Sequence, residues 1–386
     1  PRALADPVEP PFCGTDRISK GPWVASVDGT TAIVRWETCV PGPTSLSLTP
    51  EAGGDARTVE GTTSSHEVLT KVKAILPDRG ADLPGTWFLH EARLDSLAPS
   101  TCYAYQAAGE AGGRFCTARS PGQDLRFAFI ADTNPGLAIE SISKLFTTVA
   151  DFRPDLTLHG GDMQYYSSGL EPYAWWFGAT APLLRSGVMW PAVGNHESEK
   201  TDEFTDYYER FWGGIGRDNV GHSYHFDSAG VHFFSLNTEE SLETGSPQFT
   251  WASQQLAAAT TQPGYRFSVV FFHRPLATCG DSDELEAARP ALQPLFKASH
   301  VRLVLNGHMH GYERFDLDGT SCIVAGGGGG LIGDIDANAQ RPLCGQRQAH
   351  GAFTHVVTFE LTGTTLTGKA IDAKGETRDT FTLTVP

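Results

Sequence analysis

The sequence is short of positive charge and contains no long apolar run. It has 29 Lys and Arg residues against 45 Asp and Glu residues, so its formal net charge is −16. Such a surface repels the phosphates of DNA and RNA, and we expect no general affinity for nucleic acid. No segment approaches the roughly 18 apolar residues that a transmembrane helix needs, so we expect none. Nothing in the sequence indicates an oligomeric state.

Seven cysteines are present. Cys102 and Cys116 lie symmetrically about Gly109-Glu110, as facing positions of a β-hairpin do. Residues directly opposite each other in antiparallel strands lie close enough for a disulfide. This pair favours an oxidising compartment, so we expect a secreted or periplasmic protein.

Two further disulfides are hypotheses on weaker grounds. They pair Cys13 with Cys39 and Cys279 with Cys344, and they leave Cys322 as a buried thiol. The alternative is that all seven cysteines are reduced and pack as small hydrophobic side chains. The chain also begins without a basic and then apolar leader, which fits a processed mature protein.

The first third of the chain has the pattern of an all-β region. After an extended lead-in over residues 1 to about 20, the segment 31–37 alternates and places Ala32, Val34 and Trp36 on one face. Segments 87–94 and 101–106 are further expected strands. The 386 residues are enough for two domains, and we place the boundary after residue 122.

Beyond residue 122, strands alternate with helical patterns, which is typical of an α/β domain. Residues 135–149 carry apolar side chains at helical spacing. Further helices are expected over 170–185, 249–259 and 287–299, a hairpin over 223–237, and strands over 321–325, 353–361 and 364–372.

Five apolar runs in this second region each end in a residue type that binds metal ions. These endings are Asp132 after 125–131, Asp162 with Tyr165 after the run ending at Leu158, Asn195 after 188–194, His273 after 267–272, and His308 with His310 after 301–307. Runs that are apolar on both faces predict strands buried on both sides, and ligands bind beyond the carboxyl ends of such strands. We therefore expect these side chains to converge on one metal site.

Each of these residues has an ordinary structural explanation when it is taken alone. An aspartate after a glycine commonly makes a turn, and a tyrosine commonly packs in a core. The recurrence over five strands favours the metal site instead. An aspartate and a phenol delivered together, as Asp162 and Tyr165 are, suit a hard, highly charged ion.

Taken together, Asp132, the motif 161–165, the motif 194–197, His273 and the motif 307–310 resemble the binuclear metallophosphoesterases, and among them the purple acid phosphatases. The resemblance implies an α+β or α/β fold. A fibronectin type III-like β-sandwich over residues 1–122 would precede a two-sheet α/β metallophosphoesterase domain over 123–386. Residues 97–105 resemble the corner of such a sandwich, where a tyrosine hydroxyl bonds back to the backbone.

The family pattern also implies a role for each metal-binding residue. Three residues would bind Fe(III) and three would bind a divalent ion (Zn, Mn or Fe), with Asp162 bridging the two ions. The ferric ligands would be Asp132, Tyr165 and His310, and the divalent ligands Asn195, His273 and His308. Phenolate and carboxylate suit Fe(III), whereas imidazole and an amide oxygen suit the divalent ions.

The implied reaction is hydrolysis of a small phosphate ester by a metal-bound hydroxide, with His196 as the general acid for the leaving group. The candidates for contacts with the substrate are His222, Arg274 and Asn134. Other metallophosphoesterases often have a histidine ligand at the position of Asn134, and plant enzymes have histidines where this chain has the segment 279–283.

The motifs determine the metal chemistry but leave the shape of the substrate pocket open. A phosphomonoesterase is therefore the first hypothesis, and a phosphodiesterase or nucleotide-cleaving enzyme on the same metals is the second. A third hypothesis, of a different class, is a non-catalytic surface-binding protein with a vestigial metal site.

Overall fold

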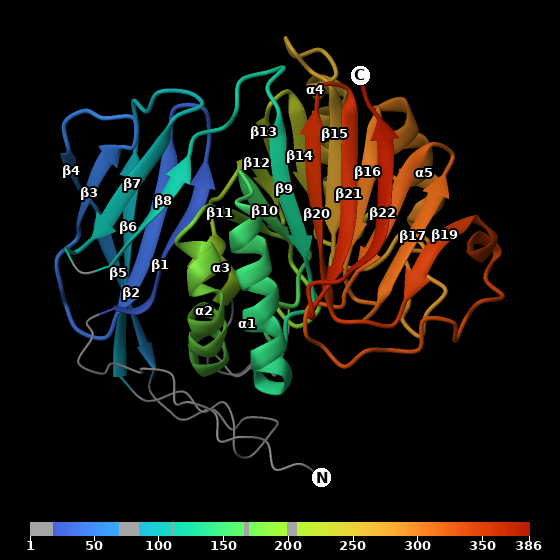
Figure 1. Ribbon diagram of the computed structural model, residues 1–386, viewed down its shortest axis with the longest axis horizontal. Coiled ribbons are helices and arrows are strands. Elements are labelled where there is room, and N and C mark those ends of the chain that lie inside the picture. The colour runs from blue at the N-terminus through green and yellow to red at the C-terminus, as the bar shows by residue number, and fades with distance from the viewer. Residues whose placement is uncertain (1–17, 69–84, 110, 166–169, 199–206) are drawn as a thin grey trace.

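The computed structural model describes residues 18–68, 85–109, 111–165, 170–198 and 207–386. Within these residues, two large β-sheets lie face to face, and a smaller sheet completes a β-sandwich at the N-terminal side (Figure 1). Helices cover the outer faces of the large sheets, so the C-terminal two thirds of the chain has four layers, α/β/β/α.

The larger sheet has ten strands among the described residues. Their spatial order is β22 (Thr377–Thr384), β21 (Thr365–Asp372), β20 (His355–Thr362), β9 (Leu125–Ile130), β10 (Leu156–His159), β11 (Val188–Pro191), β1 (Ile18–Val27), β2 (Ala32–Thr38), β6 (Gly85–Leu94) and β5 (Thr62–Val68). The second large sheet runs β12 (Arg217–Val220), β13 (Ser223–Ser228), β14 (Val231–Ser235), β15 (Phe267–Phe272), β16 (Val301–Asn306), β18 (Thr320–Ala325), β17 (Tyr312–Leu317) and β19 (Arg347–Gly351).

The small sheet and the helices complete the described elements. The sheet runs β4 (Arg57–Glu60), β3 (Ser45–Pro50), β7 (Cys102–Ala107) and β8 (Ala111–Cys116). The helices are α1 (Pro135–Phe152), α2 (Leu170–Leu184), α3 (Tyr207–Trp212), α4 (Pro247–Ala259), α5 (Arg289–Ala298) and the 3-10 helix η1 (Pro342–Gln346). No described helix has the length and apolar character needed to cross a bilayer.

The N-terminal strands belong to the same sheet as the strands of the second region. β1 pairs in parallel with β11, with Val24 opposite Val188, and antiparallel with β2. The expected lead-in over residues 1–20 therefore ends earlier than predicted, because β1 begins at Ile18. The sheet continues across the predicted boundary at residue 122, and the boundary itself stays a prediction.

Strand β2 differs from its sequence pattern. All seven of its residues are buried, although the alternation predicted one buried face. The second face carries Arg35 and Glu37, which are covered because they bond to residues of α3 and its C-terminal turn. Arg35 donates to the carbonyls of Phe211 and Gly213, both at 2.7 Å, and Arg210 donates to Glu37 at 2.8 Å.

The predicted corner contact is present in the sandwich. The Tyr103 hydroxyl accepts a hydrogen bond from the backbone N–H of Ala98 at 2.8 Å. Cys102 and Cys116 are directly opposite each other in β7 and β8 and form a disulfide, as predicted.

The other cysteine predictions have different outcomes. The Cys279–Cys344 disulfide is confirmed, and Cys322 is a buried free thiol. The predicted partner of Cys39 is Cys13, which lies outside the described residues.

The layers follow from alternation along β9. Phe127 and Phe129 point between the two large sheets, where Phe127 stacks on Phe359 at 4.5 Å between ring centroids. Ala128 and Ile130 point the other way, against the apolar face of α1. The predicted face of that helix is buried at Ile142, Leu145, Phe146 and Val149.

Most other elements lie where the sequence predicts them. The hairpin β13–β14, the helices α2, α4 and α5, and the strands β18, β20 and β21 match the expected segments within a few residues. The sequence patterns did not predict the strands β1, β3, β4, β5, β12, β17, β19 and β22, or the helices α3 and η1. Helix α3 has only 6 residues, and half of the 8 residues of β22 are threonine, so neither presents a strong apolar period.

Candidate metal centre

The five predicted strand endings meet at one edge of the two stacked sheets. β9, β10 and β11 are adjacent and parallel in the ten-stranded sheet. β15 and β16 are adjacent and parallel in the eight-stranded sheet. Their carboxyl ends therefore open on the same side, and the loops that follow carry all seven predicted ligands.

Three of these loops hold a predicted ligand in the left-handed backbone region. The φ angles are 59° at Asp132, 53° at Asp162 and 67° at His308. Residues other than glycine rarely adopt this conformation, and such strain concentrates at functional sites. Close packing supports these turns, because a Cβ atom on Gly194 would collide with the Asp162 carboxylate and one on Gly307 with that of Asp132.

Asp132, Tyr165 and His310 form the first group of donor atoms. The Tyr165 hydroxyl lies 3.2 Å from Oδ1 of Asp132 and 2.8 Å from Nε2 of His310. The same Nε2 lies 3.4 Å from Oδ1 of Asp132. A carboxylate, a phenol and an imidazole therefore present their donor atoms to one small volume.

Asn195, His273 and His308 form the second group. Nε2 of His273 lies 3.0 Å from Oδ1 of Asn195 and 3.1 Å from Nδ1 of His308. An amide oxygen and two imidazole nitrogens thus meet on the other side of the site.

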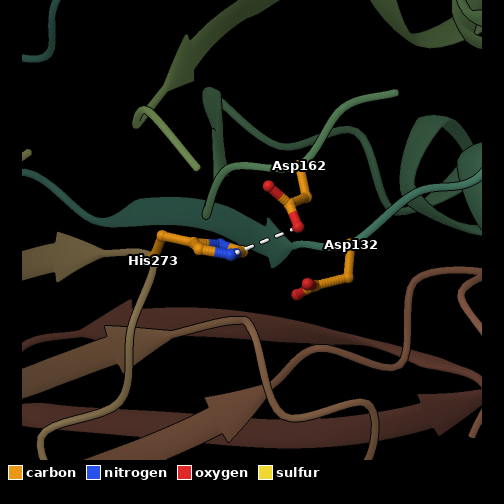
Figure 2. Close-up of side chains that lie close together, drawn as sticks. All are labelled: Asp132, Asp162 and His273. Carbon is orange, nitrogen blue, oxygen red and sulfur yellow. Dashed lines mark ion pairs between the residues drawn. The ribbon is translucent and has the colours of Figure 1, made fainter. Parts of the chain in front are cut away.

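Asp162 lies close to one residue of each group, Asp132 and His273 (Figure 2). Its Oδ2 is 3.3 Å from Nε2 of His273. Asp132, Asp162 and His273 each offer a donor atom, these three atoms lie within 4.8 Å of one another, and all three residues are buried. Asp162 therefore has a donor atom of each group nearby, and its bridging role stays a prediction.

Each of the three imidazoles has its outer nitrogen held by an oxygen. Nδ1 of His273 is 2.9 Å from the carbonyl of Gly160, and Nδ1 of His310 is 2.8 Å from that of Leu331. Nε2 of His308 is 2.6 Å from Oδ1 of Asp283. Because carbonyls and carboxylates only accept, the outer nitrogen of each ring carries a proton, and the inner nitrogen faces the other donors.

The charges of the site favour a cation. Burial alone would lower the pKa of His273, but Asp162 and Asp132 outweigh it and raise that pKa to about 10. Burial would raise the pKa of Asp162, yet the positive potential of His273 lowers it to about 2. For Tyr165, burial and then the charges of Asp132 and Asp162 raise the pKa well above its usual value. The donors and their potential fit a pair of metal ions.

His196 lies at the mouth of this cluster. Its backbone N–H donates to Oδ1 of Asp162 at 2.9 Å, and its ring lies against Tyr165 with centroids 4.2 Å apart. Nε2 is 3.9 Å from Oδ2 of Asp162, and the side chain is 24% exposed. The imidazole is therefore both close to the donors and open to solvent.

The three predicted substrate contacts lie in different surroundings. Arg274 is nearest to the cluster, with Nη1 3.3 Å from Nε2 of His308, but its guanidinium is ion-paired to Glu239 and Asp283. Asn134 begins α1, and its buried Oδ1 has no hydrogen-bond partner among the described residues.

His222 lies in the turn between β12 and β13. Its Nδ1 is 3.4 Å from Glu209, and its ring packs edge-on against Tyr208. These contacts do not include a predicted metal ligand, so His222 stays a prediction as a substrate contact.

Two carboxylates near the cluster were not identified from the sequence. Glu197 is buried and accepts backbone N–H groups from Asp162 at 2.7 Å, Met163 at 2.8 Å and Gly194 at 2.8 Å. It therefore fastens the loop after β10 to the loop after β11. The signal available in the sequence was that Glu197 lies within the motif 194–197. Asp283, the second carboxylate, lies in the loop after the disulfide-bonded Cys279, where no motif marked it.

Four similarities to known proteins bear on this site. Residues 125–312 match the family described as calcineurin-like phosphoesterase. The probable purple acid phosphatase 20 of Arabidopsis thaliana is 28% identical over 269 residues, which cover 64% of this chain. The chain spans 61% of the length of that plant protein.

Solved structures share the fold across nearly the whole chain. The structure of purple acid phosphatase PPD1 from yellow lupin (Lupinus luteus) seeds has a TM-score of 0.77 at 18% identity, covering 94% of this chain and 74% of that chain. The structure of PhoD has a TM-score of 0.62 at 12% identity, covering 96% and 94%. At these identities the likeness is one of fold.

Proposed function

We propose that this chain is a metal-dependent hydrolase of phosphate monoesters, because residues 125–312 match the calcineurin-like phosphoesterase family and the chain is 28% identical over 269 residues to a probable purple acid phosphatase. One observation carries the proposal. The seven expected donor residues form two groups with Asp162 close to one residue of each, and they come from five strand endings in two sheets. A structural role alone does not require carboxylates, a phenol and three oriented imidazoles in one place.

The donors of each group fit a different ion. Asp132, Tyr165 and His310 would hold Fe(III), because a carboxylate and a phenolate suit a hard trivalent cation. Asn195, His273 and His308 would hold a divalent ion such as Zn, Mn or Fe. When bound, two cations would polarise the phosphoryl group and lower the pKa of water.

The chain itself would supply orientation and a proton. Asp162 fixes the backbone of His196 through its Oδ1, so the imidazole faces the same opening as the donor atoms. The side chain is 24% exposed, so solvent reaches the ring beside the donor atoms. His196 would then give its proton to the departing alkoxide. Asn134, His222 and Arg274 remain proposals as substrate contacts.

The proposal extends to the N-terminal region and to location. The two sheets and the Tyr103 corner support a fibronectin type III-like sandwich over residues 1–122. The disulfides Cys102–Cys116 and Cys279–Cys344 support an oxidising compartment, hence secretion or export to a periplasm.

The test combines metal content with turnover. Purified protein loaded with iron and zinc should contain two metal equivalents per chain and hydrolyse p-nitrophenyl phosphate faster than bis-p-nitrophenyl phosphate. The reverse order of rates would favour the phosphodiesterase alternative. Protein that holds two metals and cleaves neither ester would refute the enzymatic proposal and favour the non-catalytic binding protein. Removal of the metals by a chelator should abolish turnover, and re-addition should restore it.

A further inference from the structure

The outer partner of His308 differs in kind from those of the other two imidazoles. His273 and His310 are held by neutral backbone carbonyls, of Gly160 and Leu331. His308 is held by a carboxylate, because Oδ1 of Asp283 lies 2.6 Å from its Nε2. A carboxylate behind a histidine fixes the ring and makes its other nitrogen a stronger electron donor.

Asp283 is held in place even though its side chain is 64% exposed. Arg274 contacts both of its oxygens, with Nη1 3.0 Å from Oδ1 and 2.7 Å from Oδ2. The other edge of the same guanidinium binds Glu239, with Nε at 2.8 Å and Nη2 at 3.1 Å. Arg274 directly follows the predicted ligand His273, so its ion pairs with Glu239 and Asp283 lie next to the site.

The backbone that carries Asp283 is fixed as well. The Cys279–Cys344 disulfide ties the start of the loop to η1. The Ser282 hydroxyl donates to the carbonyl of His308 at 3.2 Å, and Glu284 accepts the backbone N–H of Thr278 at 2.9 Å. The loop therefore presents its carboxylate to His308 at a set distance.

We propose that Asp283 is a positioning residue for the divalent metal position, and this inference rests on the proposed binuclear function. By accepting the Nε2 proton of His308, Asp283 turns Nδ1 of that ring toward His273 and strengthens it as a ligand. Arg274 holds the carboxylate in this position. His310, the imidazole of the proposed ferric group, is held from behind by the carbonyl of Leu331 instead, so the effect should fall on the divalent position.

The test replaces Asp283 by asparagine, which keeps its shape and one oxygen but removes its charge. Divalent affinity is measured by titrating zinc into iron-loaded protein and counting metals after dialysis. The Asp283→Asn variant should bind zinc on the order of 10- to 100-fold more weakly than wild type. Its iron content and the visible absorption of its iron site should be unchanged.

Two matched variants separate positioning from loop structure. Asp281→Asn alters a carboxylate of the same loop that accepts the backbone N–H of Asp334 at 3.1 Å, and it should bind zinc as wild type does. Asp283→Glu keeps the charge and should retain more zinc affinity than Asp283→Asn. Melting curves of all three variants report on folding.

The outcomes distinguish this inference from the proposed function. If wild type binds two metals and Asp283→Asn binds zinc within about twofold of it, the positioning role is wrong while the binuclear proposal stands. Equal losses in Asp281→Asn and Asp283→Asn, or equal losses of iron and zinc, would also overturn the role, because the loop rather than the charge would then matter. If wild type itself binds no second metal, the proposed function fails first.

Discussion

At the scale of single residues, Tyr165 decides what kind of ion the first group can hold. Its hydroxyl lies between a carboxylate and an imidazole, and burial together with the charges of Asp132 and Asp162 raises its pKa well above the usual value. Only a strongly polarising cation can replace that proton. Metal binding at this group should therefore release a proton and create a phenolate.

This gives a prediction about colour. If Fe(III) binds the phenolate, charge transfer should make the iron-loaded protein pink to purple, and Tyr165→Phe should remove the visible band. The control is Tyr312→Phe, whose hydroxyl bonds to Asp379 instead of to the site and whose loss should leave the band unchanged. An iron-loaded wild type without a visible band would refute the assignment of Tyr165 as a ligand.

A second residue-scale prediction concerns His196. A general acid contributes most when the leaving group is a basic alkoxide, on the order of 10²- to 10⁴-fold, and little when it is a stable phenolate. His196→Ala should therefore slow an alkyl phosphate severely and an activated aryl phosphate much less, with both metals retained.

The measurement is a leaving-group series on wild type and His196→Ala at matched metal content. His225→Ala is the comparison, because His225 of β13 contacts Asp218 at 3.2 Å and has no proposed role at the site. A uniform loss across the series would mean that His196 orients the substrate or supports the metals. The proton donor would then have to be another group.

At the scale of elements, the contact between β2 and α3 is unusual because it is polar and buried. Lys20 and Glu37 form an ion pair in which both side chains are fully buried, and Arg210 of α3 binds the second oxygen of Glu37. Burial raises the pKa of Glu37, but Lys20 and Arg210 outweigh it, so the net direction is downward. Glu37 therefore stays charged and joins three elements, β1, β2 and α3.

Removing that charge should destabilise the protein strongly. Glu37→Gln removes the buried carboxylate that Lys20 and Arg210 share, and breaking such a buried pair typically costs about 3–5 kcal/mol. The control is Glu51→Gln, which breaks an exposed pair with Arg114 and should change the unfolding free energy by about 1 kcal/mol or less. Denaturant unfolding at pH 7 measures both variants, and similar values for the two would contradict the prediction.

The same pair predicts a pH dependence. The pKa of Glu37 is lower in the folded than in the unfolded chain, so its contribution to stability is present above the unfolded value of about 4.5. It is lost as the pH falls through the folded value. The difference in unfolding free energy between wild type and Glu37→Gln should thus be constant from pH 7 to about pH 5.5 and shrink on further acidification. If the difference in unfolding free energy increased in acid instead, the pKa of Glu37 would have to be raised, not lowered, by folding.

At the scale of the whole molecule, the sequence predicted best those strands and helices that have a clear local pattern of apolar residues. The strands that deliver Asp132, Asp162, Asn195, His273 and His308 were predicted because each is an apolar run ended by a metal-binding residue type. Helix α1 was predicted because its apolar spacing fits a helix over 18 residues. The spacing of apolar residues and the residues that end each apolar run can both be read from the sequence without knowing the fold.

The parts that sequence missed depend on contacts between distant segments. Glu197 and Asp283 are ordinary acidic residues until the fold brings backbone N–H groups or an imidazole to them. Arg35 and Glu37 suggested a solvent-facing side of β2 because their partners lie some 175 residues away, on α3. A polar residue at an alternating position looks the same in sequence whether water or a buried partner satisfies it.

The shared sheet has a consequence for how the chain unfolds. β1 of the N-terminal region pairs with β11, whose loop carries Asn195, and Trp23 of β1 packs against Phe177 of α2 at 4.6 Å between centroids and against Trp212 of α3 at 6.0 Å. Removing the sandwich would expose this aromatic cluster and leave one side of β11 without a partner strand. We therefore expect the two regions to unfold together instead of as independent domains.

The corresponding prediction is a single transition for the metal-loaded chain, in which circular dichroism, tryptophan fluorescence and the visible iron band change at the same temperature. Trp23→Ala, which lies outside the metal site, should cost about 3–5 kcal/mol and shift all three signals equally. A fragment of residues 123–386 should also be unstable. It lacks β1, which pairs with β11, the strand that leads to Asn195. Two resolved transitions, with the iron band surviving the first, would show that the sandwich is a separate unit joined to an independently stable metal-binding domain.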